Sequence, residues 1–364
     1  MVKRFSIKSF IGLLLVGLGV VGWQSWNWWV WASAPPLPTA TAPDQNPINL
    51  SIPPGTSAQE IGQYLEKLGV IRSAQAWNLW TRWLLFQNSS GGFQAGTYQL
   101  SKSEPMQSIA TKIWEGDVAE LSFTIPEGWS IQEMAQYFEQ QNFFSAQAFI
   151  DATNQVSTAE YPWIPTTTLV AGFPRLEGYL FPDTYQIPLG EGVKPEVVVR
   201  QMLDRFEQVA LPIYQQQQGK TNLSLAEWVT LGSIVEKEAV IPTERARISG
   251  VFHNRLRKQM PLASDPTVEY AFGIKQTPDR PLTYAQVGTP SPYNTYVNPG
   301  LPPAPIASPG KASLEATLNP EATDYLYFVA RYDGTHVFSR TLAEHQAAQN
   351  TIHDQREATK SPTQ

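Results

Sequence analysis

The hydropathy pattern begins with one long apolar segment near the N-terminus. Residues 10–23 contain no charged side chain, and a tryptophan-rich stretch extends the segment to residue 31. A helix over residues 10–31 would be roughly 33 Å long, which is enough to cross the hydrocarbon core of a bilayer, about 30 Å. The tryptophans lie where an aromatic belt is expected at the membrane surface. We therefore predict a single-pass transmembrane helix within residues 1–31.

The charges around this segment predict its orientation. The charged residues before Asp44 are Lys3, Arg4 and Lys8. Because basic residues accumulate on the cytoplasmic side, we predict a cytoplasmic N-terminus, with the bulk of the chain outside the inner (plasma) membrane. A cleaved signal peptide is the alternative, since residues 32–34 have the A-x-A form. The tryptophan-rich stretch before that site favours a retained anchor.

An internal repeat organises the sequence that follows a proline-rich linker over residues 32–47. Residues 52–65 match residues 125–138 at eight of fourteen positions, with an offset of 73. Each copy has a Pro/Gly turn, an N-cap serine with a glutamate three residues later, and apolar positions at helical spacing. We predict repeated strand-turn-helix-helix units over residues 48–160.

These units resemble LysM-like modules, short βααβ folds that bind N-acetylglucosamine-containing glycans. The resemblance implies a polysaccharide partner. Trp129 in the second copy replaces Thr56 of the first at the turn. An aromatic side chain at an exposed turn can stack on a sugar, so Trp129 is a candidate substrate-binding residue.

A helix that ends in acidic residues is predicted from about residue 225 to residue 239. Ser224 and Glu227 form a capping box. The apolar positions that follow at helical spacing are Trp228, Leu231, Ile234 and Val235. Glu238 continues this stripe, whereas Glu236 lies about 200° around the helix from it. Loss of water and the helix C-terminus both raise the pKa of a carboxyl placed like Glu238, which a general acid near neutral pH requires.

The composition narrows the classes of function. The chain has 364 residues, a net charge of −6 and no basic block, so we expect no nucleic-acid partner. Cysteine is absent and the four histidines form no H-E-x-x-H pattern, so we expect no metal and no other cofactor. Proline and glycine together number 54, which is typical of many turns and short elements. With the predicted helices and short strands, the fold class is mixed α+β.

Six short strings carry a family resemblance. They are residues 233–238 (SIVEKE), 251–256 (VFHNRL), 264–268 (SDPTV), 293–296 (YNTY), 300–303 (GLPP) and 325–329 (YLYFV). Together they resemble the MltG (YceG-like) family of endolytic murein transglycosylases, over residues 48 to about 349. That family cuts the MurNAc-GlcNAc bond of nascent peptidoglycan and leaves a 1,6-anhydro end. Ala263 departs from the longer polar residue usual before the SDPTV string.

The resemblance implies a catalytic domain over residues 161–350, followed by a polar tail over residues 351–364. It also implies that a glutamate of the E-K-E string is catalytic; we expect Glu238, with Glu236 as the second choice. Further candidates come from the aromatic-rich segment 176–185, the motif strings and the repeat. The candidates for substrate binding are Glu177, Tyr179, Arg255, Asp265, Tyr293, Asn294, Thr295, Tyr296 and Trp129.

Two alternatives stay open at this point. A muramidase would hydrolyse the same bond and use Asp265 or Glu177 as a second acid. A non-catalytic scaffold would bind peptidoglycan within the cell-wall synthesis machinery. In all three readings the expected partners are peptidoglycan strands and cell-wall synthases.

Overall fold

The structure is a computed structural model. It describes residues 7–37, 47–87, 91–157, 159–165, 170–189, 193–277, 279–331 and 333–360, with side chains described from residue 14 to residue 356. Lys3, Arg4, the side chain of Lys8 and most of the predicted linker lie outside the described residues. The last four residues of the predicted polar tail do so too.

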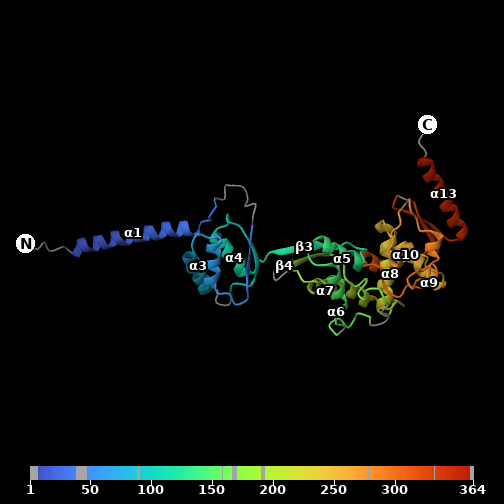
Figure 1. The fold of residues 1–364 in the computed structure, drawn as a ribbon, viewed down its shortest axis with the longest axis horizontal. Helices are drawn as coiled ribbons and strands as arrows, with labels where there is room; N and C mark the ends of the chain where they lie inside the picture. The colour runs from blue at the N-terminus through green and yellow to red at the C-terminus, as the bar shows by residue number, and fades with distance from the viewer. Residues whose placement is uncertain are drawn as a thin grey trace, which may run out of the picture. The chain divides into compact units, whose positions relative to one another are not determined.

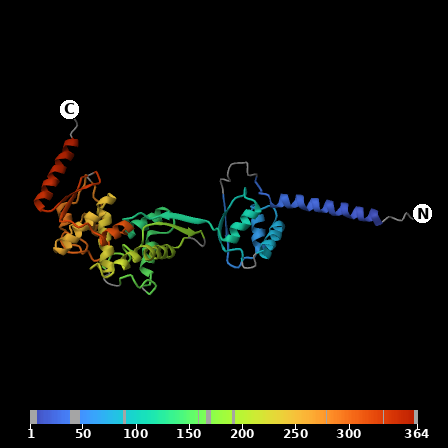
Figure 2. The ribbon, with the colours of Figure 1, turned by 180° about the vertical axis from the view of Figure 1, so that it is seen from behind.

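The chain folds into two compact units. The smaller unit contains Met1–Ser122 and Gln186–Gly192, and the larger contains Phe123–Tyr185 and Val193–Gln364. Helices predominate in both units, with short strands among them (Figures 1 and 2). The described strands form three two-stranded sheets, β1-β2, β3-β4 and β5-β6. The predicted mixed α+β class is therefore confirmed.

The N-terminal apolar segment forms helix α1, Ile7–Ser33. Within the part of the chain that the structure describes, no helix combines the length and the apolar character needed to cross a membrane. The predicted transmembrane span is therefore not confirmed. The polar side chains that interrupt the segment are Gln24, Ser25 and Asn27. Near the end of α1, Trp29 packs against Trp80, so part of the expected aromatic belt is a contact within the smaller unit.

The smaller unit consists mainly of two paired strands and three helices. Ser57 and Glu60 form the predicted capping box at the start of α2. Gly62 lets α2 approach α3 closely, because a Cβ there would collide with the ring of Trp77. The βααβ order is the one that the LysM-like resemblance implies, and the identity of the module stays a prediction. The elements are β1 (Ile48–Ile52), α2 (Ala58–Lys67), α3 (Ala74–Gln87), β2 (Gly96–Leu100), antiparallel to β1, and α4 (Met106–Glu115).

The second copy of the repeat has the same order of elements. They are β3 (Glu120–Thr124), α5 (Ile131–Gln140), α6 (Ala146–Gln155) and β4 (Thr184–Pro188). From Phe123 to Tyr185 this copy belongs to the larger unit, where α6 packs on α7 and Phe149 is completely buried. The structure thus does not group both copies into one region over residues 48–160. A repeat specifies local structure, but the surface on which its apolar face packs decides which unit it joins.

The rest of the larger unit contains further helices and one pair of strands. The elements after β4 are α7 (Pro195–Gln217), α8 (Leu225–Glu238), the 3₁₀ helix Pro242–Glu244, α9 (Arg245–Arg257), α10 (Asp265–Phe272), α11 (Tyr284–Val287), α12 (Lys311–Leu318), β5 (Tyr327–Ala330), β6 (His336–Ser339) and α13 (Leu342–Lys360). Strands β5 and β6 form a hairpin near the C-terminus. Its strands are antiparallel, with Tyr327 opposite Ser339 and Ala330 opposite His336.

Helix α8 is confirmed with its predicted capping box and ends at Glu238. The predicted apolar stripe is too narrow, because every residue from 228 to 235 is buried where α8 packs against α9 and α12. The indole nitrogen of Trp228 donates to the carbonyl of Leu314 on α12 at 2.9 Å. Since residues 228–235 are buried on every side of the helix, position on an apolar face cannot decide which of Glu238 and Glu236 is the better candidate acid. The two glutamates differ in the contacts that their side chains make.

Candidate active site

Glu238 is the last residue of α8, and its side chain is half-buried. The hydroxyl of Ser264 donates to its Oε1 at 2.6 Å. Burial raises the pKa of Glu238 to about 7, and the charges of Asp265 and Glu269 add to this effect. The hydrogen bond from Ser264 and the charge of Arg255 oppose it. The carboxyl can therefore hold or release a proton near neutral pH.

Ser264 is fixed by its own network. The serine is 1% exposed, and its backbone N–H donates to Thr295 Oγ1 at 3.0 Å. The preceding residue, Ala263, has φ of 47°, which is uncommon for a residue other than glycine. Its N–H donates to the carbonyl of Thr295 at 3.0 Å. Ser264 is part of the SDPTV string, but the sequence predicts no functional role for it, because an uncharged serine is not distinguished by its residue type.

Glu236 makes structural contacts. Its Oε2 accepts the backbone N–H of Gly310, the N-cap of α12, at 3.0 Å. Arg245 lies 3.9 Å from its Oε1, and the glutamate side chain is 7% exposed. Glu127 lies near the same cluster, and its pKa is raised by burial and by the charge of Glu236. Glu236 thus ties α8 to the start of α12.

Arg255 directs its guanidinium to the protein backbone. Its Nε donates to the carbonyl of Leu326 and its Nη1 to that of Leu262, both at 2.6 Å. The guanidinium also lies 5.2 Å from the ring centre of Tyr327. The side chain is 8% exposed. Arg255 therefore contributes its positive charge near Glu238 rather than free donors for a substrate.

Asp265 is the first residue of α10, and both of its carboxylate oxygens are engaged. Oδ1 accepts the hydroxyl of Tyr296 at 2.5 Å, and Oδ2 accepts the side-chain amide of Gln276 at 3.0 Å. Burial raises the pKa of the Tyr296 hydroxyl, so the tyrosine stays neutral and donates. The charge of Asp265 also acts on Glu238, so the pair lies near that carboxyl.

Four other candidates lie below the surface. Tyr293, Asn294 and Thr295 are each at most 1% exposed, and Tyr179 is 4% exposed. The side-chain amide of Asn294 donates to two backbone carbonyls, and Thr295 Oγ1 contacts Ser264 and Thr267. The uncharged donors expected in the cleft are thus used to hold the loop of residues 293–296 in place. In this structure the four side chains are packed inside the protein rather than at its surface.

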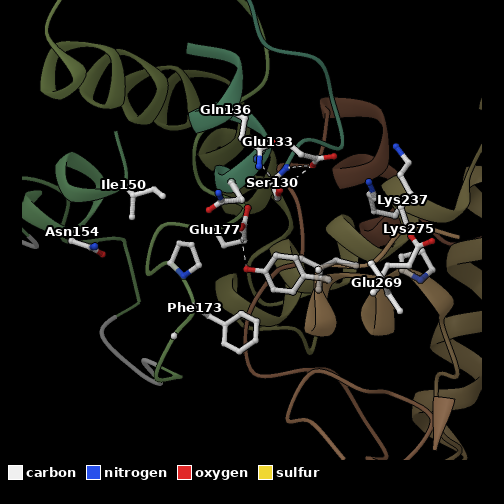
Figure 3. Close-up of a pocket in the computed structure, with 18 residues that line it drawn as sticks. Ser130, Glu133, Gln136, Ile150, Asn154, Phe173, Glu177, Lys237, Glu269 and Lys275 are labelled. Carbon is white, nitrogen blue, oxygen red and sulfur yellow. Dashed lines mark hydrogen bonds between the residues drawn. The ribbon is translucent and has the colours of Figure 1, made fainter. Parts of the chain in front are cut away.

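Glu177 lies at the base of a cavity of about 700 Å³, named here the α5-α10 pocket (Figure 3). Its Oε1 accepts the N–H of Ile131 at the start of α5 at 3.1 Å, and its Oε2 accepts the hydroxyl of Tyr270 at 3.0 Å. Burial raises the pKa of Glu177 to about 8, against both hydrogen bonds. The lining residues are Ser130, Gln132, Glu133, Gln136, Ile150, Asn154, Gly172, Phe173, Pro174, Glu177, Lys237, Pro266, Glu269, Tyr270, Gly273, Ile274, Lys275 and Ile306.

Trp129 is half-buried rather than fully exposed. Its ring meets that of Tyr137 edge-on, with 5.4 Å between the ring centres. Its carbonyl accepts the N–H of Ser308 at 2.8 Å. The residue does not line the α5-α10 pocket. The turn of the second repeat is thus attached to the segment that precedes α12.

The described residues contain no group of three or more His, Cys, Asp or Glu side chains that could hold a metal ion. Two histidines have protein partners. His336 Nδ1 lies 2.7 Å from a carboxylate oxygen of Glu244, and His253 Nε2 lies 2.9 Å from the carbonyl of Thr317.

Comparisons with known proteins agree in the family they indicate. A family model described as the YceG-like family matches residues 50–351. A Bacillus subtilis protein named endolytic murein transglycosylase is 36% identical over 83% of this chain and 83% of its own. A Streptococcus pneumoniae protein of the same name is 31% identical over 94% of this chain, which spans 65% of that relative.

A solved structure agrees with these relatives. The crystal structure of a YceG-like protein from Listeria monocytogenes is 34% identical and matches with a TM-score of 0.57, over 83% of this chain and 99% of that one. The resemblance carried by the six strings is therefore confirmed, and the chain belongs to the YceG-like family.

Proposed function

We propose that this protein is an endolytic murein transglycosylase that cuts the MurNAc-GlcNAc bond within nascent peptidoglycan strands and leaves a 1,6-anhydroMurNAc end. The named activity of its relatives supports this substrate and reaction. The observation that carries the proposal is Glu238 itself. It is half-buried at the end of α8, accepts one hydrogen bond from Ser264, and has a pKa of about 7.

Glu238 would act first as an acid and then as a base. Its carboxyl gives its proton to the glycosidic oxygen while the bond from that oxygen to C1 of MurNAc breaks. The C6 hydroxyl of the same MurNAc then bonds to C1, and its proton passes to the Glu238 carboxylate. The acid is regenerated and no water is consumed. One carboxyl suffices because the substrate supplies its own nucleophile at high effective concentration.

The two-carboxylate muramidase is less well supported. A second acid would have to carry a charge and face the sugar. Asp265 uses both oxygens to accept hydrogen bonds from Tyr296 and Gln276. Glu177 is 1% exposed, and burial raises its pKa to about 8, so it is neutral at pH 7. Neither is placed as a free carboxylate beside the bond.

The substrate also sets where the protein acts and what it meets. Murein lies outside the cytoplasmic membrane, so the larger unit would act there. A cut within a growing strand ends its elongation, and a working contact with cell-wall synthases is therefore part of the proposal. The smaller unit, with its βααβ fold, would bind glycan and would not itself catalyse cleavage.

Paired amide substitutions test the assignment. Glu238→Gln keeps the shape but removes the transferable proton, so turnover of uncrosslinked glycan strands should fall by roughly 10²–10⁴-fold. Glu236→Gln is the matched control and should retain turnover within about tenfold while losing stability. The reverse ranking would transfer the catalytic role to Glu236. If both variants kept full turnover, the activity would be attributed to a contaminating enzyme in the preparation. The non-catalytic scaffold would then be the favoured function.

A further inference from the structure

The α5-α10 pocket has a lining of mixed charge. Lys237, Lys275 and Glu269 lie toward one end of the pocket, and Ile150 and Asn154 lie toward the other (Figure 3). Glu133 is the other charged side chain along its upper wall, besides the buried Glu177. All lining residues belong to the larger unit, so the pocket is part of one compact body.

The charged end of the pocket adjoins the catalytic acid. Lys237 precedes Glu238 on α8, and the charge of Glu269 is one of those that raise the pKa of Glu238. In the proposed reaction, the MurNAc ring whose C1 is attacked must sit at Glu238. The lactyl group on that ring, and whatever is attached to it, therefore leaves the ring close to this end of the pocket.

The charged side chains that line the pocket differ in how many of their polar atoms already have hydrogen-bond partners within the protein. Glu133 is occupied by the capping box of α5, through Ser130. One oxygen of Glu269 accepts the N–H of Gln276 at 2.7 Å, and Lys237 donates one hydrogen bond to the carbonyl of Gly128 at 3.2 Å. Lys275 is exposed and has no hydrogen-bond or ion-pair partner among the described residues. Lys275, the remaining N–H groups of Lys237 and the second oxygen of Glu269 are available to a ligand.

Such a lining does not match a bare glycan. The sugar backbone offers hydroxyl and acetamido groups, which neutral amides and aromatic faces recognise. Ammonium groups are suited to carboxylates, and a free carboxylate oxygen is suited to an amine. The stem peptide that nascent strands carry on the MurNAc lactyl group has both free carboxylates and an amino group.

We infer that the α5-α10 pocket receives the stem peptide of the MurNAc residue being cut. Its carboxylates lie against Lys237 and Lys275, and its amino group faces Glu269. The uncharged end, with Asn154 and Gln136, accommodates the peptide backbone. The inference rests on the proposed function, and it makes the enzyme selective for strands that still bear peptides.

The test compares two substrates with the full-length protein. One is a preparation of uncrosslinked glycan strands with intact stem peptides, and the other is the same preparation after an amidase has removed the peptides. We expect kcat/KM to be at least about tenfold higher for the peptide-bearing strands, as for the gain of one or more charge-assisted hydrogen bonds. Equal rates on both substrates would overturn the inference and leave the proposed function intact. Cleavage of neither would overturn both.

Two variants locate the effect. Lys275→Gln should lower the ratio of kcat/KM between peptide-bearing and stripped strands by roughly three- to tenfold. Lys258→Gln removes the same charge from an exposed position just after α9, away from the pocket, and should leave the ratio unchanged. The inference would be contradicted if Lys275→Gln had the same ratio of kcat/KM as the wild type, or if both variants lowered the ratio equally. Either result would show that the pocket does not bind the peptide.

Discussion

Glu238 holds its proton near neutral pH because its carboxyl is buried at the end of α8, and Ser264 works against that effect. A hydrogen bond from a serine favours the charged carboxylate, whereas burial favours the neutral acid. The two influences place the pKa of Glu238 at about 7, where one group can serve as acid and base. Ser264 is in this sense a positioning residue for the acid.

Ser264→Ala should therefore move the pH dependence of turnover. Without the hydrogen bond, the pKa of Glu238 rises further, and the loss of kcat/KM at high pH should begin at a more alkaline pH. The rate at the optimum should fall because the carboxyl is less firmly oriented. Ser264→Thr retains the hydroxyl and should keep a profile close to that of the wild type. An alkaline limb that stays in place in Ser264→Ala would show that the serine does not act on the acid.

Glu238 should also limit stability at alkaline pH. Its pKa in the folded protein, about 7, is higher than its ordinary value of 4.5, so the folded state binds more protons between these values. The free energy of unfolding should then fall as pH rises from about 4.5 to about 7.

Glu238→Gln should remove this loss. At pH 8 the variant should unfold at a higher free energy than the wild type, by up to about 3 kcal/mol, and at pH 4 the two should be nearly equal. Denaturation curves at the two pH values measure the difference. If the variant is no more stable than the wild type at pH 8, the carboxyl is not held in a buried site.

The helices were the part of the fold most open to prediction from sequence. The capping boxes at Ser57, Ser130 and Ser224 are each observed, because a cap and its glutamate interact within four residues of chain. The end of α8 at Glu238 was predicted within one residue. Burial of α8 on all sides was not, since it depends on tertiary packing against α9 and against α12, which is far from α8 in sequence.

The packing of α9 against the segment that follows α12 can also be tested. A Cβ at Gly250 would collide with the backbone carbonyl oxygen of Glu321, which cannot rotate away as a side chain could. Gly250→Ala should lower the free energy of unfolding by about 1–3 kcal/mol, as overpacking does. The neighbouring change Ser249→Ala removes a buried hydroxyl that has no partner in the described structure and should be nearly neutral. Equal effects of the two changes in thermal unfolding would contradict this packing.

The site was only partly open to prediction. The six strings located Glu238, Asp265 and Tyr296 correctly in one region, because each string is a continuous stretch of chain. They did not distinguish residues that touch the cleft from residues that hold the loop beneath it, such as Asn294 and Thr295. That distinction depends on tertiary burial, as does the protonation of Glu177 under α5.

The division of the chain into two units also needed the structure. The repeat suggested one glycan-binding region, yet the turn of its second copy is attached at two points. Lys237 Nζ on α8 donates to the carbonyl of Gly128, and the N–H of Ser308, before α12, donates to that of Trp129. Any change in this turn is therefore expected to affect catalysis as well as binding.

The central claim is that one carboxyl, Glu238, cuts the strand with the C6 hydroxyl of MurNAc as nucleophile. Mass spectrometry of the ends produced by the full-length wild-type protein from uncrosslinked glycan strands tests it most directly. The account predicts MurNAc ends lighter than reducing ends by one water, and a rate of forming them that is roughly 10²–10⁴-fold lower with Glu238→Gln. Reducing MurNAc ends in the wild-type products would show that water is the nucleophile and would contradict the account.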